Sequence, residues 1–199
     1  MTHKNLIEIS SSAIAPDRAD VSEIPDPLRS LIGSRNGFYA FESALFVRPW
    51  GGGAGSAEWW NAPEGWRAPY GELVDGFTFF AEDVFGFQFA AGEKGFYSFD
   101  PETAELQFMA TTVNEWADQI LQDHEELTGS GLAHAWQSSN GPLRSGYRLA
   151  AAIPFCLGGE FALDALKPKR ELELARFRAD IYAQIRDLPD GAQVRINLI

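Results

Sequence analysis

Phenylalanines at alternate positions constrain the fold of this chain more than any other feature. In the segment FTFFAEDVFGFQFA, residues 77–90, they stand at 77 and 79 and again at 85, 87 and 89. Alternation of large apolar residues with smaller or polar ones is typical of strands with one buried face, so this segment predicts two strands joined by the turn AEDVFG. Two more strands are predicted at 95–100 and 105–110, joined by an Asp-Pro turn. We therefore expect an antiparallel meander over residues 77–110.

Amphipathic helices are predicted on both sides of this meander in the sequence. Apolar side chains recur at helical spacing in three segments, residues 25–37, 113–127 and 170–188. Thr112 and Glu115 form a capping box at the start of the second segment, which makes it the most strongly signalled helix in the chain. An alternating segment at 189–199 predicts a last strand.

Charge is distributed unevenly along the 199 residues. The net charge is −12, but residues 1–127 carry 21 acidic and 7 basic side chains, whereas residues 128–199 carry 7 acidic and 9 basic ones. An acidic surface repels phosphates, so we expect no binding to nucleic acid. It suits a basic protein partner, because complementary fields speed encounter. The alternative is that the charge only keeps the protein soluble.

Motifs for catalysis, cofactors and metals are missing from the sequence. The glycine-rich loop 51–55 is followed by Ser-Ala-Glu and lacks the lysine of a phosphate-binding loop. Three histidines without close ligand spacing and the single Cys156, in an apolar context that makes a thiol inert, give no metal cage and no activated nucleophile. No apolar run approaches the length of a membrane span, and the first residues do not look like a secretory signal. We expect a cytoplasmic protein without catalytic residues, cofactor or metal.

The adjacent carboxylates of Glu82 and Asp83 leave two interpretations open. As a catalytic pair they would have to face one substrate, but neighbouring side chains in an extended segment point to opposite sides. As the polar tip of a hairpin they are ordinary, because Asp bonds its own backbone in turns and Gly86 can adopt positive φ. A hydrolase would need a further carboxylate or a metal beside them, and the sequence nominates neither.

Several ordered motifs carry a resemblance to a known family. NGFYAFESAL, EWWN, FFAEDVFGFQF, WADQIL and YRL…IPFCLGGEF…LPDG resemble the bacterial SMI1/KNR4 proteins of the SUKH superfamily. The resemblance implies an α+β fold, with a curved, mostly antiparallel sheet and helices packed against it. It implies a domain over 25–130 and a C-terminal strand-helix-strand extension, 131–199, packed on the same core. Residues 1–24 match nothing in the family and are expected to be a loosely structured lead-in.

The resemblance also implies a function in protein binding. Many bacterial members are immunity proteins that neutralise toxins, whereas fungal relatives regulate cell-wall synthesis; no catalytic residues are established for the family. We therefore expect a non-enzymatic module that occludes a basic, nuclease-type toxin, and the alternative is a regulatory adapter that binds host proteins. The oligomeric state stays open. The candidate contacts are Trp59, Trp60, Trp66, Glu82, Asp83, Asp118 and Glu125.

Each of these contacts has a structural alternative. Tryptophan anchors protein interfaces when it is exposed, but in a glycine-rich segment it equally serves to pin a loop onto the core. The acidic side chains would steer a basic partner, or they would simply be solvated.

Overall fold

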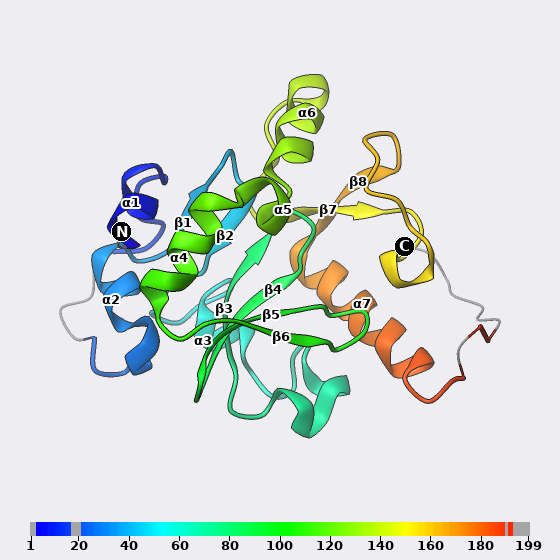
Figure 1. The fold of residues 1–199 in the computed structure, drawn as a ribbon, viewed down its shortest axis with the longest axis horizontal. Helices are drawn as coiled ribbons and strands as arrows, with labels where there is room; N and C mark the ends of the chain where they lie inside the picture. Colours follow the sequence, from blue (N-terminus) through cyan, green and yellow to red (C-terminus); the bar gives the residue numbers. More distant parts are fainter. Residues whose placement is uncertain (1–2, 17–20, 190, 193–199) are drawn as a thin grey trace.

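A six-stranded antiparallel sheet forms the centre of the protein. The computed structural model describes residues 3–16, 21–189 and 191–192, and within them each strand of this sheet pairs with the next one in the sequence (Figure 1). The strands are β1 (Phe38–Ala40), β2 (Leu45–Val47), β3 (Thr78–Asp83), β4 (Gln88–Gly92), β5 (Gly95–Phe99) and β6 (Leu106–Ala110). The meander and the antiparallel α+β architecture predicted from the sequence are confirmed.

Helices cover both faces of this sheet. One face packs against α1 (His3–Glu8), α2 (Asp26–Ser34) and α4 (Val113–Gln122). The other face packs against α3 (Ala57–Trp60), the 3-10 segment η1 (Ala68–Val74) and α7 (Glu171–Ile185). Phe80 belongs to the first core and Phe79 to the second, as side-chain alternation in β3 requires. Each face therefore has its own aromatic core.

A smaller unit stands at one end of the sheet. It contains α5 (His124–Thr128), α6 (Ser130–Asn140), the 3-10 turn η2 (Phe155–Leu157) and the antiparallel pair of β7 (Tyr147–Ala151) and β8 (Leu166–Arg170). Leu149 N donates a hydrogen bond to Val84 O at 2.8 Å, which joins β7 to the end of β3. Val84 and Phe85 pack against Leu149 and Trp136 in a third apolar cluster. The segment after residue 130 is thus packed directly on the sheet end that follows Asp83.

The predicted helix over 113–127 forms, with one break. The capping box is present, because the Thr112 hydroxyl accepts from Glu115 N and the Glu115 carboxylate accepts from Thr112 N. Asp123 leaves the helical region with φ −132°, so α4 ends at Gln122 and α5 begins at His124. Gly129 then adopts φ 68°, and a Cβ there would lie 2.3 Å from the Phe85 ring. Only glycine permits this close approach between α5 and the turn after β3.

Two expectations about the fold were wrong, and one helix was not predicted. Residues 3–8 form α1 rather than a loose lead-in, and Leu6 and Ile24 are buried in the first core. Helix α6, in a segment with weak apolar periodicity, was not predicted. Phe85 and Phe87 belong to the connection before β4 rather than to a strand. The strand expected at 189–199 lies almost entirely outside the described residues.

Trp116 on α4 allows a direct test of the first core. Its ring is fully buried and lies 5.0 Å from the centroid of Phe80 and 5.7 Å from that of Phe89. We expect Trp116→Ala to lower the free energy of unfolding by about 3–5 kcal/mol in urea denaturation, because the indole leaves a cavity between helix and sheet. Trp59→Ala is the matched control, since its side chain is 39% exposed, and it should cost less than about 1 kcal/mol. Equal losses in the two variants would contradict the packing described.

Candidate functional site: an acidic, aromatic hollow at the sheet end

Glu82 lies at the centre of a buried ion network. Its Oε1 is 2.7 Å from Arg148 Nε, its Oε2 is 3.0 Å from Arg48 Nη2, and Gln88 Nε2 donates to Oε2 at 2.9 Å. All three charged side chains are 1% exposed or less. Burial by itself would raise the pKa of Glu82, but the charges of the two arginines and the hydrogen bond from Gln88 outweigh it and lower the pKa to about 2. Glu82 is therefore a permanent anion that no partner can reach.

The network extends from the sheet to α3 and α7. Arg48 Nη1 lies 3.2 Å from Glu171 Oε1 at the start of α7, and its guanidinium stacks 3.5 Å from the Trp60 ring centroid. Trp60 Nε1 donates to Gln88 Oε1 at 2.9 Å, and Gln88 on β4 in turn donates to Glu82. Burial and the neighbouring charge of Glu82 raise the pKa of Glu171. These contacts join β3, β4, β7, α3, α7 and the residue after β2 in one network centred on Glu82.

Asp83 points to the opposite side of β3 from Glu82, as expected for adjacent residues of a strand. Its Oδ1 accepts hydrogen bonds from Phe85 N at 2.9 Å and Phe87 N at 2.8 Å, and so fixes the turn between β3 and β4. Its side chain is buried, with 5% of the residue exposed. Burial raises the pKa of Asp83 to about 7, although Arg178 and the two backbone hydrogen bonds oppose the shift.

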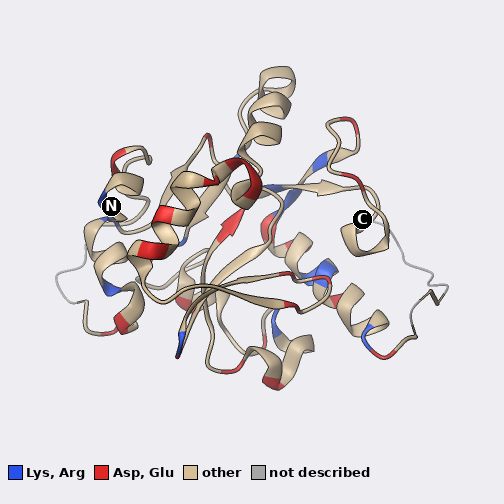
Figure 2. Cartoon of the chain, viewed as in Figure 1, with Lys and Arg blue, Asp and Glu red and all other residues tan. Residues whose placement is uncertain are grey.

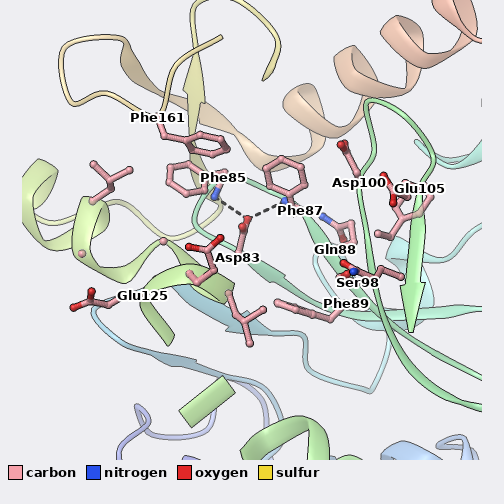
Figure 3. A pocket seen from close by; sticks show the side chains of 17 residues that line it. Asp83, Phe85, Phe87, Gln88, Phe89, Ser98, Asp100, Glu105, Glu125 and Phe161 are labelled. Atoms are coloured by element: carbon pink, nitrogen blue, oxygen red, sulfur yellow. Dashed lines mark hydrogen bonds between the residues drawn. The ribbon is translucent and has the colours of Figure 1, made fainter. Parts of the chain in front are cut away.

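A hollow of about 780 Å³ opens beside Asp83 (Figure 3). It lies between the turn after β3, the strands β4 and β5 with the turn to β6, helix α5, the start of α6, and Phe161 of the loop before β8. Five of the lining side chains are acidic: Asp83, Asp100, Glu105, Glu125 and Glu126. None of the described lining residues is Lys, Arg or His. The hollow therefore has a negative potential.

One wall of the hollow is aromatic. Phe85 and Phe87 follow Asp83 in the turn, and the Phe161 ring lies 4.9 Å from that of Phe85 (Figure 3). Phe161 stacks on Phe155 with ring centroids 3.9 Å apart and is itself 50% exposed. This wall belongs to both parts of the chain, because the turn is in the sheet and Phe161 is in the C-terminal segment.

Only two of the seven predicted contacts line this hollow. Asp83 and Glu125 both line the hollow. Glu82 is buried in the ion network. Trp60 and Trp66 are 1% exposed and belong to the core between the sheet and α3, η1 and α7. These three cannot serve as surface contacts, and the loop-pinning interpretation of the two tryptophans is correct. Trp59, 39% exposed, borders a separate hollow of about 200 Å³ that Trp60, Trp66 and Arg176 also line and Asp83 does not.

Asp118 differs from the other predicted acidic contacts. It is half-buried on α4 and does not line the hollow. In Figure 2 the ribbon is red, for Asp or Glu, at several positions of α4 and α5; of these two helices only α5 contributes residues to the lining of the hollow.

Four residues that line the hollow were not predicted as contacts: Asp100, Glu105, Glu126 and Phe161. The positions of Asp100 and Glu105 could have been predicted, because the Asp-Pro turn was expected at the same end of the meander as the turn after Asp83. Phe161 gave no signal, because its place depends on how the loop before β8 returns to the sheet.

The described residues offer little support for a metal site, a reactive thiol or a membrane span. No group of three or more His, Cys, Asp and Glu side chains in this part of the chain is arranged to hold a metal ion. Burial and then the charge of Glu102 raise the pKa of Cys156 to about 12, so the thiol is inert, as expected from its sequence context. Within the same residues, every helix is too short or too polar to cross a bilayer.

Comparison with known proteins identifies a shared fold. No protein-family model and no curated protein matches the sequence. Among solved structures, the crystal structure of Atu4351 from Agrobacterium tumefaciens matches with a TM-score of 0.57 at 13% sequence identity, over 89% of this chain and 88% of that chain. The two proteins thus share an α+β fold along most of their length. The resemblance to SMI1/KNR4 proteins stays a prediction.

Removal of the central carboxylate tests the ion network. We expect Glu82→Gln to lower the free energy of unfolding at pH 7 by about 3–5 kcal/mol, because Arg48 and Arg148 would be left buried without their shared counter-ion. Glu42→Gln is the control, since Glu42 forms an exposed pair with His134 at 3.0 Å, and it should change stability by less than about 0.5 kcal/mol. A loss below about 1 kcal/mol for Glu82→Gln in urea denaturation would show that the arginines are not held by this charge.

The raised pKa of Asp83 predicts a pH-dependent stability. The native protein keeps the Asp83 proton up to about pH 7, whereas the unfolded chain releases it near the ordinary value of 3.8. Unfolding therefore releases a proton between these values, and this group makes the free energy of unfolding fall as pH rises from about 4 to about 7.

Asp83→Asn should remove this contribution, because an amide oxygen still accepts both backbone hydrogen bonds. We expect the variant to match the wild type near pH 4 and to exceed its stability by about 1–3 kcal/mol at pH 8. Asp164→Asn, at an exposed position, is the control and should leave the pH profile unchanged. A wild-type and Asp83→Asn pair with parallel stability profiles from pH 4 to 8 would contradict the assignment.

Proposed function

We propose that this chain is a non-enzymatic protein-binding module, an immunity protein that neutralises a basic bacterial toxin by covering its active cleft. The observation that carries the proposal is the hollow at the sheet end, in which five carboxylates and an exposed phenylalanine meet without any basic lining residue. A surface of this kind complements a cationic protein, because opposite potentials steer encounter and aromatic rings supply buried contact area.

The charge of the whole chain supports the same partner class. The acidic front of the sequence, residues 1–127, supplies all five carboxylates of the hollow. A toxin that acts on nucleic acid presents a basic cleft to phosphates, and an acidic protein surface is the direct competitor for that cleft. The mechanism is therefore occlusion by an electrostatic match, without a chemical step.

The state of Glu82 removes this carboxylate, but not Asp83, from the hydrolase alternative. A general acid must hold a proton at working pH, and the pKa of about 2 keeps Glu82 ionised. Its two oxygens already bind two arginines and a glutamine, so no site is left for a substrate proton. Asp83 faces away from it across the strand, so the two carboxylates do not form a pair that could flank a scissile bond.

The test begins with the products of the neighbouring genes. We expect the purified protein to capture one basic toxin from them, and co-expression to restore the growth of cells that produce that toxin. Capture of several host proteins, together with altered growth on deletion when no toxin is present, would contradict the immunity function and support a regulatory adapter.

Charge reversal at the rim of the hollow sharpens this test. Glu125 and Glu126 are exposed on α5, so Glu125→Lys with Glu126→Lys should preserve the fold and slow association with the captured toxin by about tenfold or more at low salt. The difference from the wild type should shrink as salt rises, because screening weakens steering. The readout is the association rate in surface plasmon resonance.

A matched variant controls for total charge. Glu64→Lys with Glu72→Lys makes the same change of charge at exposed positions that do not line the hollow, and it should alter the rate by less than about threefold. Equal slowing in both variants would mean that net charge, rather than the hollow, attracts the partner.

A further inference from the structure

The carboxylates of the hollow converge from three separate elements. Asp83 comes from β3, Asp100 and Glu105 come from the connection between β5 and β6, and Glu125 and Glu126 come from α5. Charges of one sign placed around one cavity repel each other and cost stability unless a counter-charge enters it. Among the described lining residues none provides that counter-charge.

Asp83, the innermost carboxylate, uses only one of its two oxygens in the hydrogen bonds that fix the turn. Asp83 Oδ1 accepts two backbone hydrogen bonds, while Oδ2 has no hydrogen-bond partner among the residues that the structure describes. The side chain is nevertheless 95% buried, at the floor of a cavity open to the surface (Figure 3). Oδ2 does not count among the buried described atoms that lack a partner, so it reaches the surface of the hollow and is open to a donor that enters from outside.

The aromatic wall selects a flat cation. Phe85, Phe87 and Phe161 place rings next to this carboxylate. A guanidinium stacks on such rings and at the same time donates in a planar fork to carboxylates, whereas an ammonium makes point contacts only. The protein itself contains this arrangement, because the Arg178 guanidinium lies 4.9 Å from the Phe87 ring centroid and its Nε is 3.1 Å from Glu102 Oε1.

We propose that the hollow receives an arginine side chain of the bound protein, with its guanidinium between the phenylalanine wall and the carboxylates of Asp83, Glu125 and Glu126. This inference rests on the proposed function and names the group that the site recognises. The volume of about 780 Å³ exceeds that of one side chain, so residues flanking the arginine enter as well. Phe161, 50% exposed at the edge of the hollow, offers an apolar contact to those flanking residues, and Ile153 and Leu157, 50% and 37% exposed, belong to the same connection between β7 and β8.

Three peptides test the proposal without the toxin. The probe is the acetylated amide Gly-Ser-Leu-Arg-Leu-Ser-Gly, compared with versions that carry citrulline or lysine in place of arginine. We expect the arginine peptide to bind in NMR titrations with shifts confined to residues 83–89, 98–107, 125–132 and 161. The citrulline peptide, which has the same shape without the charge, should bind at least tenfold more weakly, and the lysine peptide severalfold more weakly. Equal binding of the arginine and citrulline peptides, or shifts centred on Trp59 instead, would overturn the proposal.

Variants of the protein test which carboxylates bind the arginine side chain. Glu125→Gln with Glu126→Gln should weaken the arginine peptide at least fivefold, while Glu64→Gln with Glu72→Gln, away from the hollow, should leave its affinity unchanged. If both pairs weaken it equally, the attraction is a property of the whole surface and the assigned pocket is wrong.

Protonation of Asp83 gives a second readout. The charged groups around Asp83 are Glu82 on its own strand, Arg178 from α7, Asp100 and Glu105 opposite, and Glu125 and Glu126 from α5. A cation binds the ionised form, so affinity for the arginine peptide should rise severalfold from pH 6 to pH 8 in the wild type, and this increase should vanish in Asp83→Asn. A pH dependence that persists in Asp83→Asn would remove Asp83 from the pocket.

The outcomes separate this inference from the proposed function. If the protein binds the arginine peptide but captures no toxin, the arginine pocket is supported and the immunity function is contradicted. If the wild type and the variant Glu125→Gln with Glu126→Gln capture a toxin with the same affinity, the immunity function is supported and the arginine pocket is contradicted.

Discussion

The ion network around Glu82 is the interaction on which the rest of the structure depends. One carboxylate holds Arg48 from the segment after β2 and Arg148 from β7, and Arg48 in turn reaches Glu171 on α7. These charges lie in the interior, where each would be costly alone, so the sheet, the C-terminal strands and α7 must assemble together for any of them to be paired. The C-terminal segment is therefore tied to the sheet by buried electrostatics as well as by apolar packing.

The position of the hollow follows from this network. With Glu82 fixed on one side of β3, the alternation of the strand directs Asp83 to the other side, where its hydrogen bonds to Phe85 and Phe87 shape the turn. The same attachment of β7 and β8 brings the loop with Phe161 against Phe85. The structural role of Glu82 and the position of Asp83 at the hollow are thus two consequences of one strand register.

Local signals predicted the fold better than they predicted the site. Alternating phenylalanines, the Thr112 capping box and the apolar stripe of α7 are encoded within a few residues, and the corresponding elements formed. Burial of charge is not a local property: Arg178 belongs to a helix rich in charged residues, but it lies buried against Glu102 because α7 packs on the sheet. The hollow combines residues up to 78 positions apart, from Asp83 to Phe161, so only the turn residues and the acidic helix face could be anticipated.

We propose that a basic protein partner binds at the acidic, aromatic hollow. Hydrogen–deuterium exchange of the complex with the captured toxin, compared with the free protein, measures this most directly. The account predicts added protection of the backbone amides at residues 83–89, in α5 and around Phe161, with little change at 57–66. Protection centred on 57–66, or on the α1 and α2 side of the sheet, with none around Asp83, would contradict it.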